Sequence, residues 1–202
     1  MKQIVFVLTI MFLYSCNSKQ NQEKQKEDKL SSAIENAQKS PIVETKLFLD
    51  FRFGMTEIEV ESHLDSLLKI GKIFIDDSHK YKYEFTHESG LKYNLGFSPQ
   101  YYDGRLYEMY YPIQSSVSSY DDLGYTVLFH SFMENKSDFK RFITKDSFGD
   151  PVYTNIKDNL IVIFEKTVKP FMIYENAPIS KIAKEESDRI KKEKSKNSSS
   201  EF

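Results

Sequence analysis

The sequence predicts an α+β domain in which an antiparallel sheet carries helices packed on one face. Two kinds of hydrophobic spacing support this prediction. Apolar residues recur with a helical period after residue 56, and they alternate with polar residues from residue 81 onward. The chain has 202 residues, enough for one ordinary domain with appendages. Its 16 Phe and 13 Tyr supply apolar surface for a core.

The first expected elements are an extended lead-in and a helix. Residues 46–53 alternate enough to begin as a strand. Thr56 and Glu59 have the spacing of a capping box, and Gly71 stands where a glycine commonly ends a helix. We therefore expect a helix over about residues 57–70. Its apolar side chains are Ile58, Val60, Leu64, Leu67 and Leu68.

Three strands are expected next. Residues 81–86 and 91–97 alternate between apolar and polar types around a turn at Gly90, which is typical of a β-hairpin with one solvent-facing side. A second turn at Asp103-Gly104 precedes a third strand over residues 106–113.

The second part of the domain is expected to contain helices followed by strands. Asp121 and Asp122 suit the positive end of a helix, and a further helical segment is expected from Ser137 to Ile143. Residues 160–165 and 170–175 predict two closing strands. The domain then spans residues 43–178, and 179–202 is a charged tail, helical or disordered.

Residues 1–15 are expected to be a secretory signal peptide. Lys2 gives a positive start, and an apolar run follows over residues 4–13. A membrane-spanning helix needs about 20 apolar residues, roughly twice this run. The run ends in Leu13-Tyr14-Ser15-Cys16, which resembles the lipobox of bacterial lipoproteins, although Tyr14 is larger than the residue that the family prefers there.

The resemblance implies that the signal is cut before Cys16 and that Cys16 carries the lipid. Several acyl chains on one residue anchor a domain stably, whereas one chain gives marginal binding. Asn17 follows the cysteine instead of the Asp that retains some lipoproteins at the inner membrane, which favours the outer membrane of a Gram-negative bacterium. The alternative is a chance cysteine after an ordinary signal or membrane segment.

Residues 16–42 are expected to be the lipidated cysteine and a flexible polar tether. The segment is rich in Lys, Gln, Glu, Asn and Ser, which offer little to bury. A short amphipathic helix is the alternative. It would present four apolar side chains at helical spacing, namely Leu30, Ala33, Ile34 and Ala37.

Charge and motifs exclude several classes of function. The chain has 28 Lys and Arg against 30 Asp and Glu, and residues 47–180 alone have 14 against 20, a net charge of −6. A nucleic-acid binder needs a basic surplus, which is missing. The basic tail could contact anionic lipid headgroups, or it could be a solvated helix. The one cysteine excludes internal disulfides and cysteine-based zinc clusters.

No catalytic motif is present, so we expect a protein that is not an enzyme and has no metal or cofactor. The chain lacks a P-loop, a dinucleotide-binding glycine pattern and a nucleophile elbow. Asp76, Asp77 and His79 could form an oxygen-rich metal site, but a polar turn explains them more simply. A hydrolase with a dispersed site is the less favoured alternative.

Three segments of the domain resemble known envelope proteins. They are Phe53-Gly-Met-Thr-Glu-Ile-Glu-Val60, Asp103-Gly-Arg-Leu-Tyr107 and Phe148-Gly-Asp-Pro151, the last followed by two apolar strands. The pattern is similar to SmpA/OmlA-type outer-membrane lipoproteins and to the beta-lactamase-inhibitor-protein-like fold. The resemblance implies two weakly similar helix-then-strand halves, and roles in binding and envelope assembly.

Tyrosine provides the candidate binding surface. Tyr101 and Tyr102 are expected in a loop, and Tyr110 in a strand. Exposed Tyr is suited to protein or glycan binding. A core filled by Phe and Tyr in a chain without Trp is the alternative. We therefore expect a lipid-anchored binding or assembly module with an envelope protein or glycan as partner. The alternative is an inhibitor or immunity-type protein that blocks an enzyme.

Overall fold

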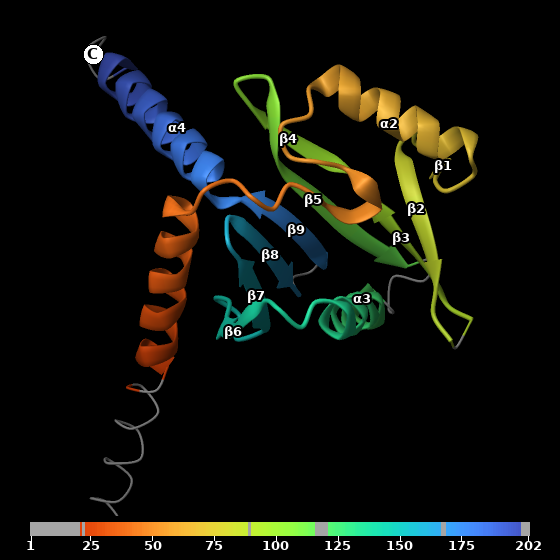
Figure 1. The fold of residues 1–202 in the computed structure, drawn as a ribbon, viewed down its shortest axis with the longest axis horizontal. Coiled ribbons are helices and arrows are strands. Elements are labelled where there is room, and N and C mark those ends of the chain that lie inside the picture. Colours follow the sequence, from red (N-terminus) through yellow and green to blue (C-terminus); the bar gives the residue numbers. More distant parts are fainter. Residues whose placement is uncertain (1–20, 22, 89, 116–120, 167–168, 199–202) are drawn as a thin grey trace, which may run out of the picture.

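A nine-stranded antiparallel sheet forms the centre of the molecule, and helices pack on it (Figure 1). The computed structural model describes residues 21, 23–88, 90–115, 121–166 and 169–198. Its helices are an N-terminal helix over residues 23–39, η1 (Phe48–Asp50), α2 (Glu57–Lys69), α3 (Asp121–Asn135) and α4 (Ala177–Ser198). The predicted α+β class is confirmed.

The strands form two meanders that meet in the middle of the sheet. Their bounds are β1 (Phe74–Ile75), β2 (Tyr81–Thr86), β3 (Lys92–Gly96), β4 (Ser98–Tyr102), β5 (Arg105–Ser115), β6 (Lys140–Lys145), β7 (Pro151–Lys157), β8 (Leu160–Glu165) and β9 (Phe171–Asn176). The order is β1-β2-β3-β5-β9-β8-β7-β6, with β4 also paired to β5. Each half is therefore a helix followed by strands, and the last strand of each half pairs with the other.

Helix α2 begins as the sequence predicts. The Thr56 side chain accepts a hydrogen bond from the Glu59 amide at 3.2 Å, and the Glu59 carboxylate accepts one from the Thr56 amide at 2.7 Å. This reciprocal arrangement satisfies two amides that a helix start leaves unpaired. Val60 is buried, but Ile58 is 78% exposed, because it projects from the opposite side of the helix. The predicted helix is confirmed, and Ile58 is not part of its buried side.

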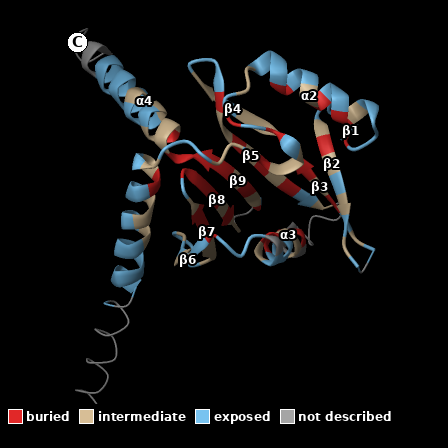
Figure 2. Cartoon of the chain, viewed as in Figure 1, coloured by how far each residue is buried: buried red, intermediate tan, exposed pale blue. Residues whose placement is uncertain are grey.

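One hydrophobic core fills the inner face of the sheet. It joins side chains of α2, α3 and the segment around η1 to β3, β5, β8 and β9. Figure 2 shows the burial concentrated in the sheet and on the sheet-facing sides of α2 and α3. In α3, a side chain at Gly124 would place its Cβ 2.3 Å from the Tyr93 ring. Only glycine allows this close approach of α3 to β3.

Two predicted elements near residues 46 and 137 are wrong. The lead-in does not form a strand: Leu49 and Asp50 adopt left-handed φ angles, and the chain reverses so that Lys46 pairs with Arg52. The helical segment expected from residue 137 is mainly β6, paired in register with β7. Its apolar residues fit either period over so short a run, and the free edge of β7 decides the outcome.

The prediction of a flexible polar tether was also wrong for residues 23–39. These residues form the short amphipathic helix that the sequence indicated as the alternative. Its four apolar residues pack with Ile156, Ile161 and Ala177 on the outer face of the sheet. After the helix, the amides of Val43 and Glu44 donate to Asn159 Oδ1 at 2.9 and 2.8 Å. The N-terminal segment is therefore docked, and helices occupy parts of both faces of the sheet rather than one.

The C-terminal tail forms α4, which begins at a buried residue, Ala177, directly after β9. The N-terminal helix and α4 meet at the end of β9 and diverge from it (Figure 1). Within the described part of the chain, no helix is both long enough and apolar enough to cross a bilayer. Cys16 and the signal segment lie outside the described residues.

Candidate binding surface

The three predicted tyrosines do not form one surface. Tyr101 and Tyr102 lie in β4 rather than in a loop, so successive side chains point to opposite faces. Tyr101 packs against the core, and its burial raises the pKa of its hydroxyl to about 12, with Glu57 and Glu61 adding to the effect. The Tyr102 hydroxyl bonds Glu186 of α4, which raises its pKa.

Tyr110 is the predicted tyrosine that lies on the outer face of the central strands. Residues that oppose each other on antiparallel strands share a face. Tyr110 of β5 opposes Ile173 of β9, and Pro112 opposes Phe171. The Tyr110 and Phe171 rings lie 4.8 Å apart at an angle of 41°. We call these four half-buried residues, Tyr110, Pro112, Phe171 and Ile173, the outer strip.

The outer strip is the apolar part of this face that the helices leave uncovered. One row further along the strands, Ile161 and Ile156 are buried under the N-terminal helix. On β9 the Glu175 carboxylate accepts a 3.1 Å hydrogen bond from Lys184 of α4. Over β5 and β9, the contacts of the described helices thus reach the row of Glu175, and Tyr110 and Ile173 remain half-buried.

Carboxylates lie at two borders of the strip. Glu165 of β8 opposes Phe171, and burial, followed by the charge of Asp146, raises its pKa. Glu108 of β5 opposes Glu175. Burial raises the pKa of Glu108 most, the Glu175 charge raises it further, and Lys184 partly offsets both. The strip therefore has an acidic border on these two sides.

A cavity of about 490 Å³ adjoins the strip on the β2 side. Tyr110 and Pro112 line it together with Lys82 of β2, whose side chain is only 7% exposed. The Lys82 ammonium donates to Gln114 Oε1 at 3.1 Å and lies 3.7 Å from Asp76 Oδ2. A side chain at Gly96 would place its Cβ 3.5 Å from this ammonium and 3.0 Å from Pro112.

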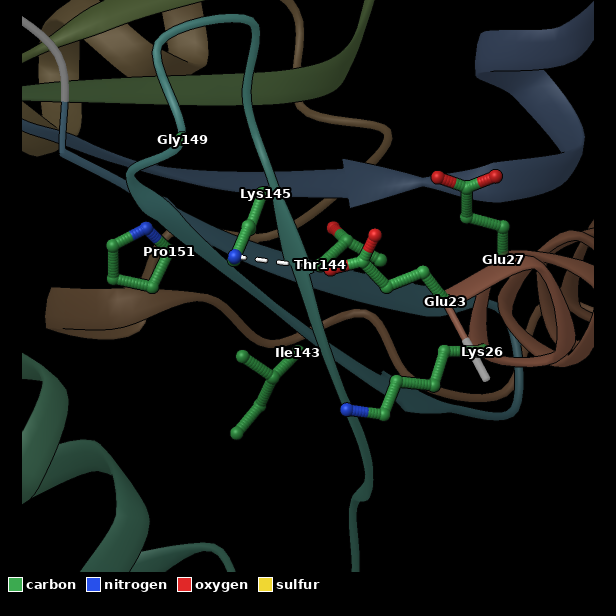
Figure 3. Close-up of a pocket in the computed structure, with 8 residues that line it drawn as sticks. All are labelled: Glu23, Lys26, Glu27, Ile143, Thr144, Lys145, Gly149 and Pro151. Atoms are coloured by element: carbon green, nitrogen blue, oxygen red, sulfur yellow. Dashed lines mark ion pairs between the residues drawn. The ribbon is translucent and has the colours of Figure 1, made fainter. Parts of the chain in front are cut away.

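A second groove lies between the N-terminal helix and the edge strand β6 (Figure 3). Its volume is about 220 Å³. Lys145 of β6 reaches to within 3.8 Å of Glu23, and both side chains are about two-thirds exposed. Such exposed pairs contribute little to stability. The groove offers no buried titratable group, so we regard it as the seam along which the helix meets the sheet.

His63 and Asp76, two of the polar residues that could have carried chemistry, stabilise the local fold. The described residues contain no group of three or more His, Cys, Asp and Glu side chains placed to hold a metal. His63 bonds the Leu49 carbonyl at 2.8 Å and lies edge-on to Phe51. Asp76 Oδ1 accepts from the amides of Ser78 and Lys80, each at 2.9 Å. The polar-turn interpretation of this segment is therefore confirmed.

Sequence reasoning missed Phe171 and Lys82. Phe171 lies in a predicted strand, but its position beside Tyr110 depends on the pairing of β5 with β9, two segments about 60 residues apart. The alternating pattern places Lys82 on the polar side of its hairpin. Nothing local indicates that Gln114 of β5 and Asp76 lie beside its ammonium.

No family model matches the chain, and neither does any curated protein or solved structure. What can be said about function therefore depends on the geometry of the outer strip and its cavity.

Proposed function

We propose that the chain is a lipid-anchored envelope lipoprotein whose domain is a non-catalytic binding module. In this proposal the lipid is on Cys16, the anchor is in the outer membrane, and the partner is another envelope protein. The observation that carries the binding role is the outer strip, an aromatic and aliphatic surface on the middle strands of the sheet.

The chemistry of the strip favours a protein partner. Tyr110 and Phe171 form a ring pair that is held in place by neighbouring strands, so little side-chain entropy remains to be lost on binding. Aromatic residues surrounded by a polar border are enriched where proteins bind each other. The acidic border at Glu165 and Glu108 favours a partner with cations flanking an apolar segment.

The docked N-terminal helix supports a location close to the membrane. Residue 23, within the continuous described helix, lies seven residues after Cys16, and seven residues reach at most about 25 Å. A flexible tether extending to residue 42 would allow the domain to lie further from the membrane. A partner that reaches the outer strip is therefore expected to be membrane-bound or to lie near the membrane surface.

The binding role is tested by capturing envelope proteins with the purified domain and quantifying them by mass spectrometry. We compare the natural sequence with Phe171→Ser and with Ile58→Ser, a 78% exposed residue on the solvent side of α2 and away from the outer strip. The proposal predicts a protein that Phe171→Ser loses and Ile58→Ser retains. Equal capture by all three chains would contradict it.

The anchor is tested separately with Cys16→Ala. The proposal predicts that the substituted protein leaves the membrane fraction and lacks the added lipid mass. If it stays membrane-bound with an unchanged mass, Cys16 is not the lipid attachment site.

A further inference from the structure

The cavity beside the outer strip arises from the way that two strands share one neighbour. β3 and β4 lie end to end along the long strand β5, pairing with its residues 113–115 and 105–110 respectively. The break between them, at Phe97, leaves the start of β2 without a continuous neighbour. The cavity fills this break, with Tyr81 and Lys82 on one side and Ser98 on the other.

Lys82 places a buried positive charge at this break. An ammonium has three N–H donors. One is directed at the neutral amide of Gln114, and Asp76 Oδ2 at 3.7 Å is beyond hydrogen-bond length. The other oxygen of Asp76 accepts two turn amides. The charge of Lys82 is therefore only partly compensated within the protein.

The turn held by Asp76 brings a second lysine to the cavity, although Asp76 itself lies beside Lys82 as its partial counter-charge. It places His79, which adopts a φ of 58°, and the exposed Lys80 at the cavity. The described residues that line the cavity include no Asp or Glu. Residues 47–180 have a net charge of −6, so a cavity lined by two lysines stands out from its surroundings and is suited to an anion.

The remaining walls are largely apolar. Leu64, Phe97, Tyr110 and Pro112 also line the cavity. Its volume, about 490 Å³, is within the range of pockets that hold small molecules or single amino-acid side chains. The ligand therefore needs an anionic end and an apolar body.

We propose that this cavity binds a carboxylate attached to an apolar group, with the Lys82 ammonium as its ion-pair partner. A carboxylate fits better than a phosphate because the one buried ammonium balances a single negative charge, whereas a phosphate group carries about −1.5 to −2 at pH 7. The inference rests on the proposed function in one respect: Tyr110 and Pro112 belong to both surfaces, so the carboxylate is a group of the bound partner. A free carboxylic acid has the same chemistry.

The test uses N-acetylphenylalanine and its neutral amide as probes, with backbone NMR of the whole domain as the readout. The acid is expected to shift the signals of Lys80, Lys82 and Tyr110 and to bind about tenfold more tightly than the amide, because a charged hydrogen bond is lost in the amide. Lys82→Met should remove this difference. Lys92→Met, an exposed lysine on the neighbouring strand that pairs with Glu84, should retain it.

Several results would overturn the carboxylate site. One is equal binding of acid and amide by the natural sequence, a comparison that does not depend on any variant folding. Another is the absence of shifts at the cavity up to the solubility limit of the acid. A third is Lys82-dependent binding of inorganic phosphate without binding of the acid.

Two further experiments answer separate questions. One asks whether the carboxylate belongs to a protein chain or to a free acid, and the other asks whether the cavity and the binding module fail independently. A short peptide ending in phenylalanine should bind more tightly than N-acetylphenylalanine if the group comes from a protein chain end, and equally if it comes from a free acid. Phe171→Ser should abolish partner capture yet leave acid binding intact. If the acid binds but no partner is captured, the proposed binding function is contradicted and the proposed carboxylate site is not.

Discussion

The inner face of the sheet packs against α2, α3 and the segment around η1, whereas on the outer face the described helices leave the outer strip half-buried. On the inner face, Phe164 and Tyr111 are fully buried. On the outer face, Phe171 and Tyr110 have similar rings but remain half-buried. The contrast separates residues that the fold needs from residues that it leaves available for a partner.

Truncation of a ring on each face provides the strongest test of this contrast. Phe164→Ala should lower the free energy of unfolding by about 3–5 kcal/mol, because it leaves a cavity within the core. Phe171→Ala should cost less than half as much. Urea unfolding of both variants measures the difference, and equal losses would mean that the outer strip is part of the core.

The close contact of α3 with the inner face gives the next largest effect. Gly124→Ala would place a Cβ 2.3 Å from the Tyr93 ring, and overpacking of this kind costs about 1–3 kcal/mol. Thermal unfolding measures the loss. Gly104→Ala tests a turn glycine with open space around it but a φ of 68°, so its loss would come from backbone strain and not from a clash.

Ala37→Glu tests the covered part of the outer face. Ala37 is buried between the N-terminal helix and the sheet, and an unpaired carboxylate there is unfavourable. Hydrogen exchange should show that residues 23–39 lose protection while β8 and β9 keep theirs. Gln38→Glu, at the neighbouring, less buried position, is the control. Protection that survives Ala37→Glu would show that this helix is not held by its apolar side.

The smallest expected effect concerns the carboxylates under α4. The pKa of Glu108 is raised in the folded protein above its usual value of 4.5, by burial first and by Glu175 second. The unfolded chain therefore ionises first, and folding stability falls as the pH rises from 4.5 through the folded pKa. Glu108→Gln should remove this decline and stabilise the domain at pH 7 by less than about 1 kcal/mol.

Unfolding measured at pH 4 and pH 7 checks this prediction. The exposed Glu185 on α4 provides the control variant Glu185→Gln, which should not alter the pH dependence. A gain from Glu108→Gln that is equally large at pH 4 would indicate a change in packing rather than in ionisation.

Elements with their own local signals could be predicted from the sequence. The capping box at Thr56 fixes the start of α2, and the alternation around Gly90 fixes the β2–β3 hairpin. The N-terminal helix was predicted as a flexible tether, because its stability comes from packing on Ile156 and Ile161. These two residues are more than 115 positions away in the sequence. β6 likewise depends on the free edge of β7.

The candidate site was predictable only at Tyr110. An alternating pattern shows that Tyr110 and Tyr111 point to opposite faces, but not which face a helix will cover. The partner ring, Phe171, and the buried Lys82 reach the site through long-range strand pairing. Register between distant strands depends on the whole core, so a single sequence does not reveal it.

Site-specific photo-crosslinking in living cells that produce the protein tests the central claim most directly. A photoreactive residue replaces either Phe171 on the outer strip or Ile58, an exposed residue on the solvent side of α2. The account predicts a discrete crosslinked envelope protein from position 171 and none from position 58. If that protein is an enzyme that binding inactivates, the module is an inhibitor. A crosslinked species that resists protease would indicate a glycan, and that result, or equal crosslinking from both positions, would contradict the account.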